Sequence, residues 1–123
     1  MSRLLKDISG ATALEFALCA PAFFALAMGA IELGALGYMQ LALQQGVEAA
    51  ARCASIDKNN CANTAQIQTY ASAKSYGLSP QVSAFTVSTS ACGMMVQASY
   101  RPSYLPGFPI PATTLAAKAC FPT

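Results

Sequence analysis

The chain lacks histidine and tryptophan, and it carries few charges: seven Lys or Arg and five Asp or Glu among 123 residues. Without histidine, catalytic triads with an imidazole base and metal sites with imidazole ligands are excluded. The net charge of +2 provides no broad basic surface, so we do not expect a nucleic-acid partner. No nucleotide-binding motif is present. We therefore expect neither enzymatic activity nor a bound metal or cofactor.

Charge is missing altogether from residues 16–31, between Glu15 and Glu32, and apolar character resumes after Glu32. A membrane-spanning helix needs ~20 apolar residues. If Glu32 lies near the outer headgroups, the apolar segment extends to Tyr38. We predict a transmembrane helix over residues 11–38 that continues as an amphipathic stem over residues 39–54. The apolar side of the stem consists of Leu43, Val47, Ala50 and Ala54.

The apolar run could also belong to a buried core helix or to a cleaved signal peptide. No other segment is apolar enough to surround a helix that is hydrophobic on all sides, which argues against a core helix. Glu15 at the start of the run and the apolar residues beyond Ala30 argue against a signal peptide. Bulky Leu18 stands where a lipoprotein signal at Cys19 would need a small residue.

Arg3 and Lys6 precede the span, so the positive-inside rule predicts a cytoplasmic N-terminus and a head beyond the inner membrane, in the periplasm. Four of the five cysteines lie beyond the span: Cys53, Cys61, Cys92 and Cys120. An even number of cysteines in an oxidising compartment favours disulfide bonds. The charge bias and the cysteine count are independent, and they agree on the compartment.

The rest of the chain predicts a small α+β head over residues 55–123, made of a short helix and a three-stranded antiparallel sheet. Residues 64–76 have weak helical periodicity, ended by Gly77. Residues 81–90, 94–101 and 113–121 are predicted strands, and the helical stem should pack on one face of their sheet. The proline-rich loop over residues 102–111 would expose an apolar patch of Tyr104, Leu105, Phe108 and Ile110.

Four cysteines permit three pairings, and spacing alone does not choose among them. Cys53 ends the stem and Cys61 follows a polar turn, so a local bridge needs no long-range order. Antiparallel pairing of the second and third strands brings Cys120 back to Cys92 in the hairpin turn. We predict Cys53–Cys61 and Cys92–Cys120, with Cys19 a free thiol in the membrane. The alternative is four reduced, buried cysteines.

The start of the apolar run carries a recognisable pattern. A polar leader that ends in Gly10, with Glu15 in the fifth place after it, resembles the processing site of type IV prepilins. Residues 10–54, well under half of the chain, are similar to the TadE-like proteins of tight-adherence pilus systems. The residues that carry the similarity are Gly10, Ala13-Leu14-Glu15-Phe16-Ala17, Pro21, Gly29, Ile31-Glu32-Leu33-Gly34, Tyr38, Ala42-Leu43-Gln44 and Glu48-Ala49-Ala50-Ala51-Arg52.

The resemblance implies a minor pilin or pseudopilin, whose expected domains are a leader (1–10), a transmembrane helix (11–38), a stem (39–54) and a head (55–123). Prepilin peptidase would cut after Gly10 and leave a charged amino group on Ala11. In pilins this group pairs with the glutamate at the place of Glu15 and sets axial register as subunits join the filament. The expected partners are the peptidase, other pilin subunits and inner-membrane lipid.

The implied assembly site consists of Glu15, Phe16, Pro21 and Glu32. Glu15 lies one turn from the leader, so the alternative is that it merely reaches the cytoplasmic headgroups. Glu32 is either solvated at the outer end of the span or paired with an incoming subunit. Two other functions stay open: an uncleaved single-pass scaffold of the pilus machinery, similar to TadG-like proteins, and a major pilin, although Flp-type major subunits are usually far shorter.

Overall fold

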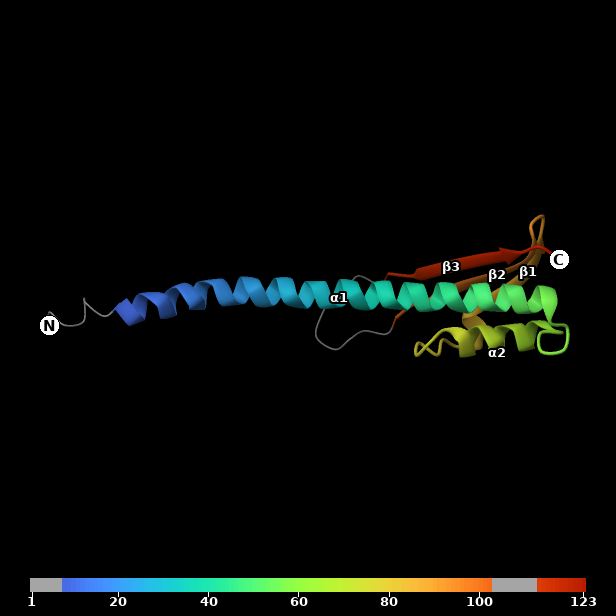
Figure 1. The fold of residues 1–123 in the computed structure, drawn as a ribbon, viewed down its shortest axis with the longest axis horizontal. Helices are drawn as coiled ribbons and strands as arrows, with labels where there is room; N and C mark the ends of the chain where they lie inside the picture. Colours follow the sequence, from blue (N-terminus) through green and yellow to red (C-terminus); the bar gives the residue numbers. More distant parts are fainter. Residues whose placement is uncertain (1–7, 103–112) are drawn as a thin grey trace. The chain divides into compact units, whose positions relative to one another are not determined.

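The computed structural model describes residues 8–102 and 113–123 (Figure 1). The chain divides into two compact units, Met1–Leu36 and Gly37–Thr123. Most of the predicted leader, with Arg3 and Lys6, lies outside the described residues. The predicted apolar patch of Tyr104, Leu105, Phe108 and Ile110 lies outside them as well.

The longest element is helix α1, which runs without interruption over Ile8–Ile56. It supplies residues 8–36 of the first unit and residues 37–56 of the second. Alanine and leucine, two of the strongest helix formers, dominate its sequence. The sequence predicts that the span begins at Ala11 and that the stem ends at Ala54. The helix begins three residues before Ala11 and ends two residues after Ala54.

A second, shorter helix, α2, covers Thr64–Lys74. The side chain of Asn63 caps its first turn by accepting a hydrogen bond from the backbone N–H of Gln66 at 2.9 Å. Gly77, just beyond the helix, has a φ of +75°, in the left-handed region where glycine ends helices without steric cost. The predicted second helix is therefore present, two residues shorter at its C-terminal end.

Three strands form one antiparallel sheet in the order β1-β2-β3: β1 (Phe85–Ser90), β2 (Gly93–Tyr100) and β3 (Leu115–Phe121). The predicted three-stranded antiparallel sheet is confirmed. The first strand begins later than expected, because Val82–Ala84 forms a short 3₁₀ helix, η1. This segment follows Ser79, whose φ is +41°, and Pro80, so the chain is still turning where a strand was expected.

The turn between β1 and β2 depends on Gly93, which has a φ of +118°. A Cβ at this position would lie against the backbone at the end of β3, 2.7 Å from Cα of Pro122. Glycine thus lets the end of β3 approach the turn closely. The strand register pairs Met95 with Cys120, which brings Cys120 beside the turn that carries Cys92.

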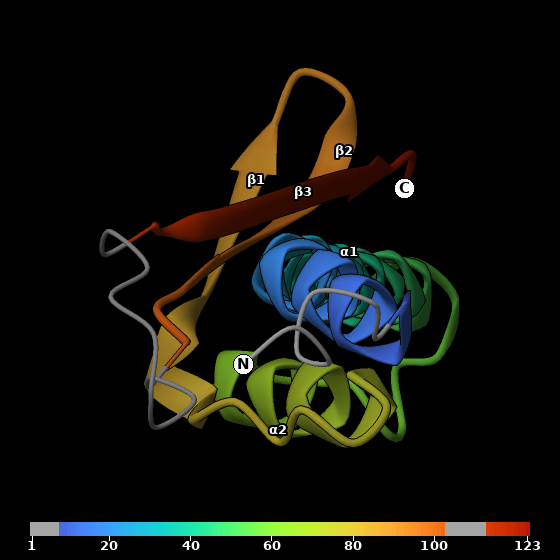
Figure 2. The same cartoon turned by 90° about the vertical axis from the view of Figure 1, so that its left-hand side faces the viewer.

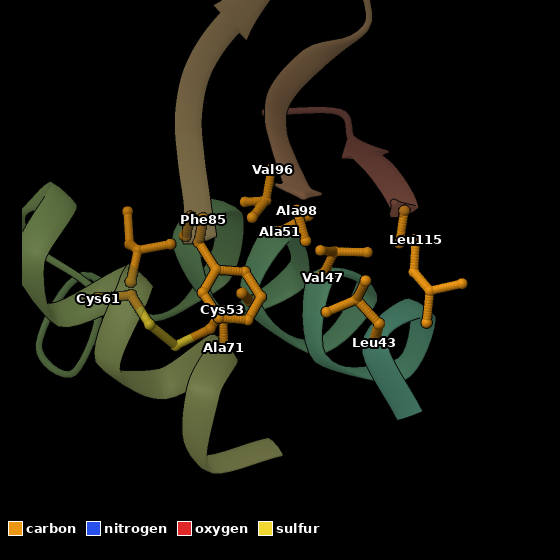
Figure 3. Close-up of a cluster of buried hydrophobic side chains, with 14 residues drawn as sticks. Leu43, Val47, Ala51, Cys53, Cys61, Ala71, Phe85, Val96, Ala98 and Leu115 are labelled. Atoms are coloured by element: carbon orange, nitrogen blue, oxygen red, sulfur yellow. A yellow bond between two sulfur atoms is a disulfide. The ribbon is translucent and has the colours of Figure 1, made fainter. Parts of the chain in front are cut away.

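Within the second unit, α1 lies between the sheet and α2 (Figure 2). The side of α1 that the sequence marked as apolar is buried, and Ala51 joins it. Figure 3 shows how this side meets the sheet and α2. Burial of each larger apolar side chain stabilises the head by about 1.5–3 kcal/mol. The core residues are Leu43, Val47, Ala50, Ala51 and Ala54 of α1, Ile67 and Ala71 of α2, and Phe85, Val96, Ala98, Leu115 and Ala117 of the sheet.

Side chains of α1 also bond to the outer edge of β3. Gln40 Nε2 donates to the backbone oxygen of Ala116 at 2.8 Å, and Gln44 Nε2 donates to that of Lys118 at 3.3 Å. Ser55 Oγ donates to the backbone oxygen of Pro122 at 2.6 Å. The helix thus satisfies two carbonyl groups of β3 that an edge strand would leave unpaired, those of Ala116 and Lys118.

Candidate functional site on the N-terminal helix

The first unit exposes a large apolar surface on residues 10–36. Phe16 is 74% exposed and Leu26 is 76% exposed, although water-soluble proteins usually bury such side chains. Among the described residues, one helix, Gly10–Ile56, is long and apolar enough to cross a membrane, and none of its most apolar window is buried. This fits a single-pass membrane protein, since lipid is the environment that favours exposed apolar side chains.

The predicted processing residues, Gly10 and Ala11, lie in the first turns of α1 and are exposed. A Cβ placed on Gly10 would meet no atom within 4 Å. Packing therefore does not explain why glycine stands there. The bond between the two residues lies inside the helix, because α1 begins at Ile8.

The predicted assembly residues lie along α1 and do not converge on a cavity. Glu15 and Phe16 are exposed, and Pro21 stands inside the helix without ending it. Because proline has no N–H, the carbonyl of Ala17 one turn earlier lacks its usual helical partner. In a single chain, the predicted site is thus a helix surface and not a pocket.

Glu15 and Glu32 are the only charged residues between positions 10 and 36, and this segment contains no cation. Seventeen residues separate them, about 25 Å at the helical rise. Glu15 is exposed, whereas Glu32 is partly buried. A carboxylate within the hydrocarbon layer costs about 2.5–3.5 kcal/mol on insertion scales, so each needs a partner from elsewhere or the polar edge of the bilayer.

Two disulfide bonds lie in the head and have the connectivity predicted from the sequence. Cys53–Cys61 joins the end of α1 to the segment before α2, with Cα atoms 5.9 Å apart, and Figure 3 shows it against Phe85. Cys92–Cys120 joins the hairpin turn to β3, with Cα atoms 6.2 Å apart. Both separations lie in the usual range for disulfides. Cys19 is a free, exposed thiol.

The sequence did not predict a groove of about 1000 Å³ on the head, which follows the exposed side of α1 between α2 and β3. Helical periodicity marks that side of α1 as polar, but it does not reveal which elements flank it. Residues that line the groove include Tyr38, Leu41, Gln45, Arg52, Lys74 and Lys118. Within the described part of the chain, no group of three His, Cys, Asp or Glu side chains is placed to hold a metal ion.

The apolar helix and the fold fit one class of protein: single-pass membrane proteins with a small, disulfide-bonded α+β head. The model of the family described as TadE-like protein matches residues 10–52. The match covers about a third of the chain and ends inside α1, so it includes none of the strands. It confirms the resemblance drawn from the sequence and implies a protein associated with a Tad pilus. No curated protein and no solved structure matches the chain.

Proposed function

We propose that the chain is a minor pilin or pseudopilin of a tight-adherence pilus system, and that it is not an enzyme. One observation supports the proposal most directly. The TadE-like match, residues 10–52, covers the exposed apolar helix that contains Glu15. In this role the protein waits in the inner membrane, is cut by prepilin peptidase after Gly10, and then joins or primes a filament through its N-terminal helix.

The proposed orientation places the N-terminus in the cytoplasm and the head in the periplasm. Arg3 and Lys6 before the span support it through the positive-inside rule. The two disulfide bonds of the head support it too, because such bonds persist in oxidising compartments and are rare in the cytoplasm.

Glu15 would act in assembly through the amino group that cleavage creates on Ala11. The two residues are four apart on α1 and therefore lie on one face of the helix. Since residues 10–36 contain no cation, this amino group, from the same chain or from a neighbouring subunit, is the nearest positive charge that the proposal provides for Glu15. Pairing with a neighbour would fix the axial register of the subunits.

An uncleaved, single-pass scaffold of the pilus machinery is the second candidate. One observation favours it: α1 starts at Ile8, so the bond between Gly10 and Ala11 is helical. Peptidases generally bind extended substrates, so cleavage requires the first turn of α1 to unwind. Helix ends fray readily, and this cost is small.

Processing is tested by the mass and N-terminal sequence of the protein isolated from its host. We expect a chain that begins at Ala11, and we expect Gly10→Trp to retain the leader because it places a bulky side chain at the bond to be cut. A host without prepilin peptidase is the control and should yield the full-length chain. Recovery of intact Met1 or Ser2 from a peptidase-positive host would refute cleavage and favour the uncleaved scaffold.

A further inference from the structure

The charges of the head are distributed unevenly. Residues 37–123 contain five cations and two carboxylates, Glu48 and Asp57. Both carboxylates lie on the later part of α1 or just after it, and Arg52 and Lys58 are their nearest cations in the sequence. Glu48 already accepts a hydrogen bond from Gln44 at 2.8 Å. The other three cations are Lys74, Arg101 and Lys118. Lys74 and Lys118 line the same groove as Glu48, so this groove has two cations and one carboxylate besides Arg52.

Lys74 lies beside the first turn of α1 in the head. It is the last residue of α2, and two residues later the backbone oxygen of Tyr76 accepts a hydrogen bond from Tyr38 Oη at 2.9 Å. Lys74 Nζ lies 5.5 Å from the ring centroid of Tyr70 and is otherwise exposed to solvent. Tyr38 and Tyr76 are themselves exposed, at 58% and 61%.

The sheet brings the other two cations to the same end of the head. Gln40 and Gln44 hold β3 along the first turns of α1, and the backbone oxygen of Lys118 is the acceptor for Gln44. Arg101 follows the last residue of β2, and its Nε donates to Thr114 Oγ1, just before β3, at 3.2 Å. Figure 1 shows the end of β2 and the start of β3 beside these turns of α1.

We call the surface formed by Tyr38, Leu41, Lys74, Tyr76, Arg101 and Lys118 the basic rim. It begins at Tyr38, two residues after Leu36, the last residue of the apolar first unit. Leu41 is 61% exposed. Tyrosine is enriched where a protein crosses the boundary between membrane and water. A leaflet that contains anionic lipid attracts lysine and arginine side chains that lie near its surface.

We propose that the basic rim binds the headgroups of anionic phospholipids at the membrane surface from which α1 emerges. At the helical rise, Gln44 lies about 9 Å beyond Tyr38, so the rim stays within the Debye length of about 10 Å at ordinary salt. The long stems of lysine and arginine can lie along apolar surface while their charges reach the headgroups. This proposal rests on the membrane-spanning helix and does not depend on pilus assembly.

The test uses the full chain in detergent micelles and measures binding of phosphatidylglycerol and phosphatidylcholine by native mass spectrometry. A Lys74→Gln/Lys118→Gln variant is compared with Arg52→Gln/Lys58→Gln, which removes the same charge from exposed positions farther from the span. Arg52 lines the same groove but lies about 21 Å beyond Tyr38 at the helical rise, which is more than a Debye length. Each cation near an anionic surface contributes about 5-fold in affinity, so the rim variant should bind phosphatidylglycerol about 25-fold more weakly. Binding by the control variant should stay close to that of the unaltered chain.

Equal losses in the two variants would show general attraction by net charge and overturn the proposal, as would equal binding of the two lipids by the unaltered chain. Non-reducing peptide mapping of both variants checks that the head is folded. A third result also overturns it: if the rim variant and Glu32→Gln both lose self-association while phosphatidylglycerol binding is unchanged, the rim binds a second copy of the chain. The measurement needs no pilus, so failure leaves the proposed function standing.

Discussion

Gly46 lies where α1 is in close contact with the C-terminal end of α2. A Cβ on Gly46 would collide with Ser75 Oγ and lie 2.8 Å from the backbone oxygen of Ala71. Ser75 is fully buried, and its hydroxyl donates to that same oxygen at 2.8 Å. A side chain at position 46 would have to displace the backbone of α2 and this buried, hydrogen-bonded hydroxyl, which favours glycine there.

Gly46→Ala should therefore destabilise the head, by roughly 1–3 kcal/mol as for other overpacked sites. Gly37→Ala is the matched control, because a Cβ there meets nothing within 4 Å. In the control, the higher helix propensity of alanine should leave the midpoint of thermal unfolding unchanged or raise it. Circular dichroism of the full chain in detergent measures both midpoints, and equal midpoints would contradict the close approach.

Asp57 has an acid-dependent role in the turn after α1. Its carboxylate accepts hydrogen bonds from the side chain of Asn60 at 2.7 Å and from the backbone N–H groups of Asn60 and Asn59 at 3.2 Å and 3.0 Å. These bonds, the Asn60 side chain first, hold the pKa of Asp57 below its ordinary value of 3.8. The stabilisation is therefore present above pH 3.8 and is lost as the pH falls through the lower, folded-state pKa.

A titration followed by NMR should place the midpoint of the Asp57 carboxyl below 3.8. Asn60→Ala removes the strongest of the hydrogen bonds and should raise the midpoint toward the ordinary value. A midpoint at or above 3.8 in the unaltered chain would mean that these hydrogen bonds do not persist in solution.

At the scale of the elements, the connectivity of the two disulfide bonds tests the order of the strands. Cys92 and Cys120 are 28 residues apart in sequence, and closing that loop should stabilise the head by roughly 3–4 kcal/mol in the chain-entropy estimate. Non-reducing peptide mapping should recover Cys53 with Cys61 and Cys92 with Cys120, and one reactive thiol, Cys19, after denaturation. A peptide that links Cys53 to Cys92 or Cys120 is incompatible with this strand order.

The sequence predicted what depends on local pattern and left out what depends on contact between elements. The apolar side of the stem, the β-alternation of residues 85–90 and the stop at Gly77 are all properties of neighbouring residues. The contact of Gly46 with Ser75 depends on how two helices cross, which no periodicity records. The composition of residues 82–84 predicts a strand, but these residues follow the turn at Ser79 and Pro80 and form a 3₁₀ helix.

The same limit applies to the candidate sites. Gly10, Glu15 and Glu32 stand out in sequence because a charge or a glycine is unusual in an apolar helix. The sequence does not distinguish three cations, Lys74, Arg101 and Lys118, from other surface charges. Their positions near one end of the head follow from the arrangement of α2, β2 and β3. A motif can be recognised within one segment, but a surface assembled from three segments becomes visible only in the fold.

For the whole molecule, the proposed function predicts that one substitution can affect filament assembly without affecting membrane insertion. Glu15→Val removes a charge that is costly in hydrocarbon, so insertion should be unimpaired or improved, whereas pili should be lost because the register pair cannot form. Cys19→Val, one turn further on the same face of α1, is the control and should leave piliation unchanged. Membrane fractionation and electron microscopy of surface pili report the two properties, and normal piliation by the valine variant at position 15 would refute the register role.

The hydrogen bonds that α1 makes to β3 have a further consequence for the sheet. Side chains of Gln40 and Gln44 bond to the β3 edge, and Ser55 bonds to Pro122 just after it. Among the described residues, the β1 edge receives a side-chain bond only at Phe85, from Gln68 Nε2 at 2.7 Å. In the terms of polymer chemistry, the described part of the head has one reactive end, the β1 edge, because side chains of α1 bond to the other edge. Growth by strand addition would then stop at a pair of molecules, and the endless two-sided stacking of amyloid would first require α1 to leave the sheet.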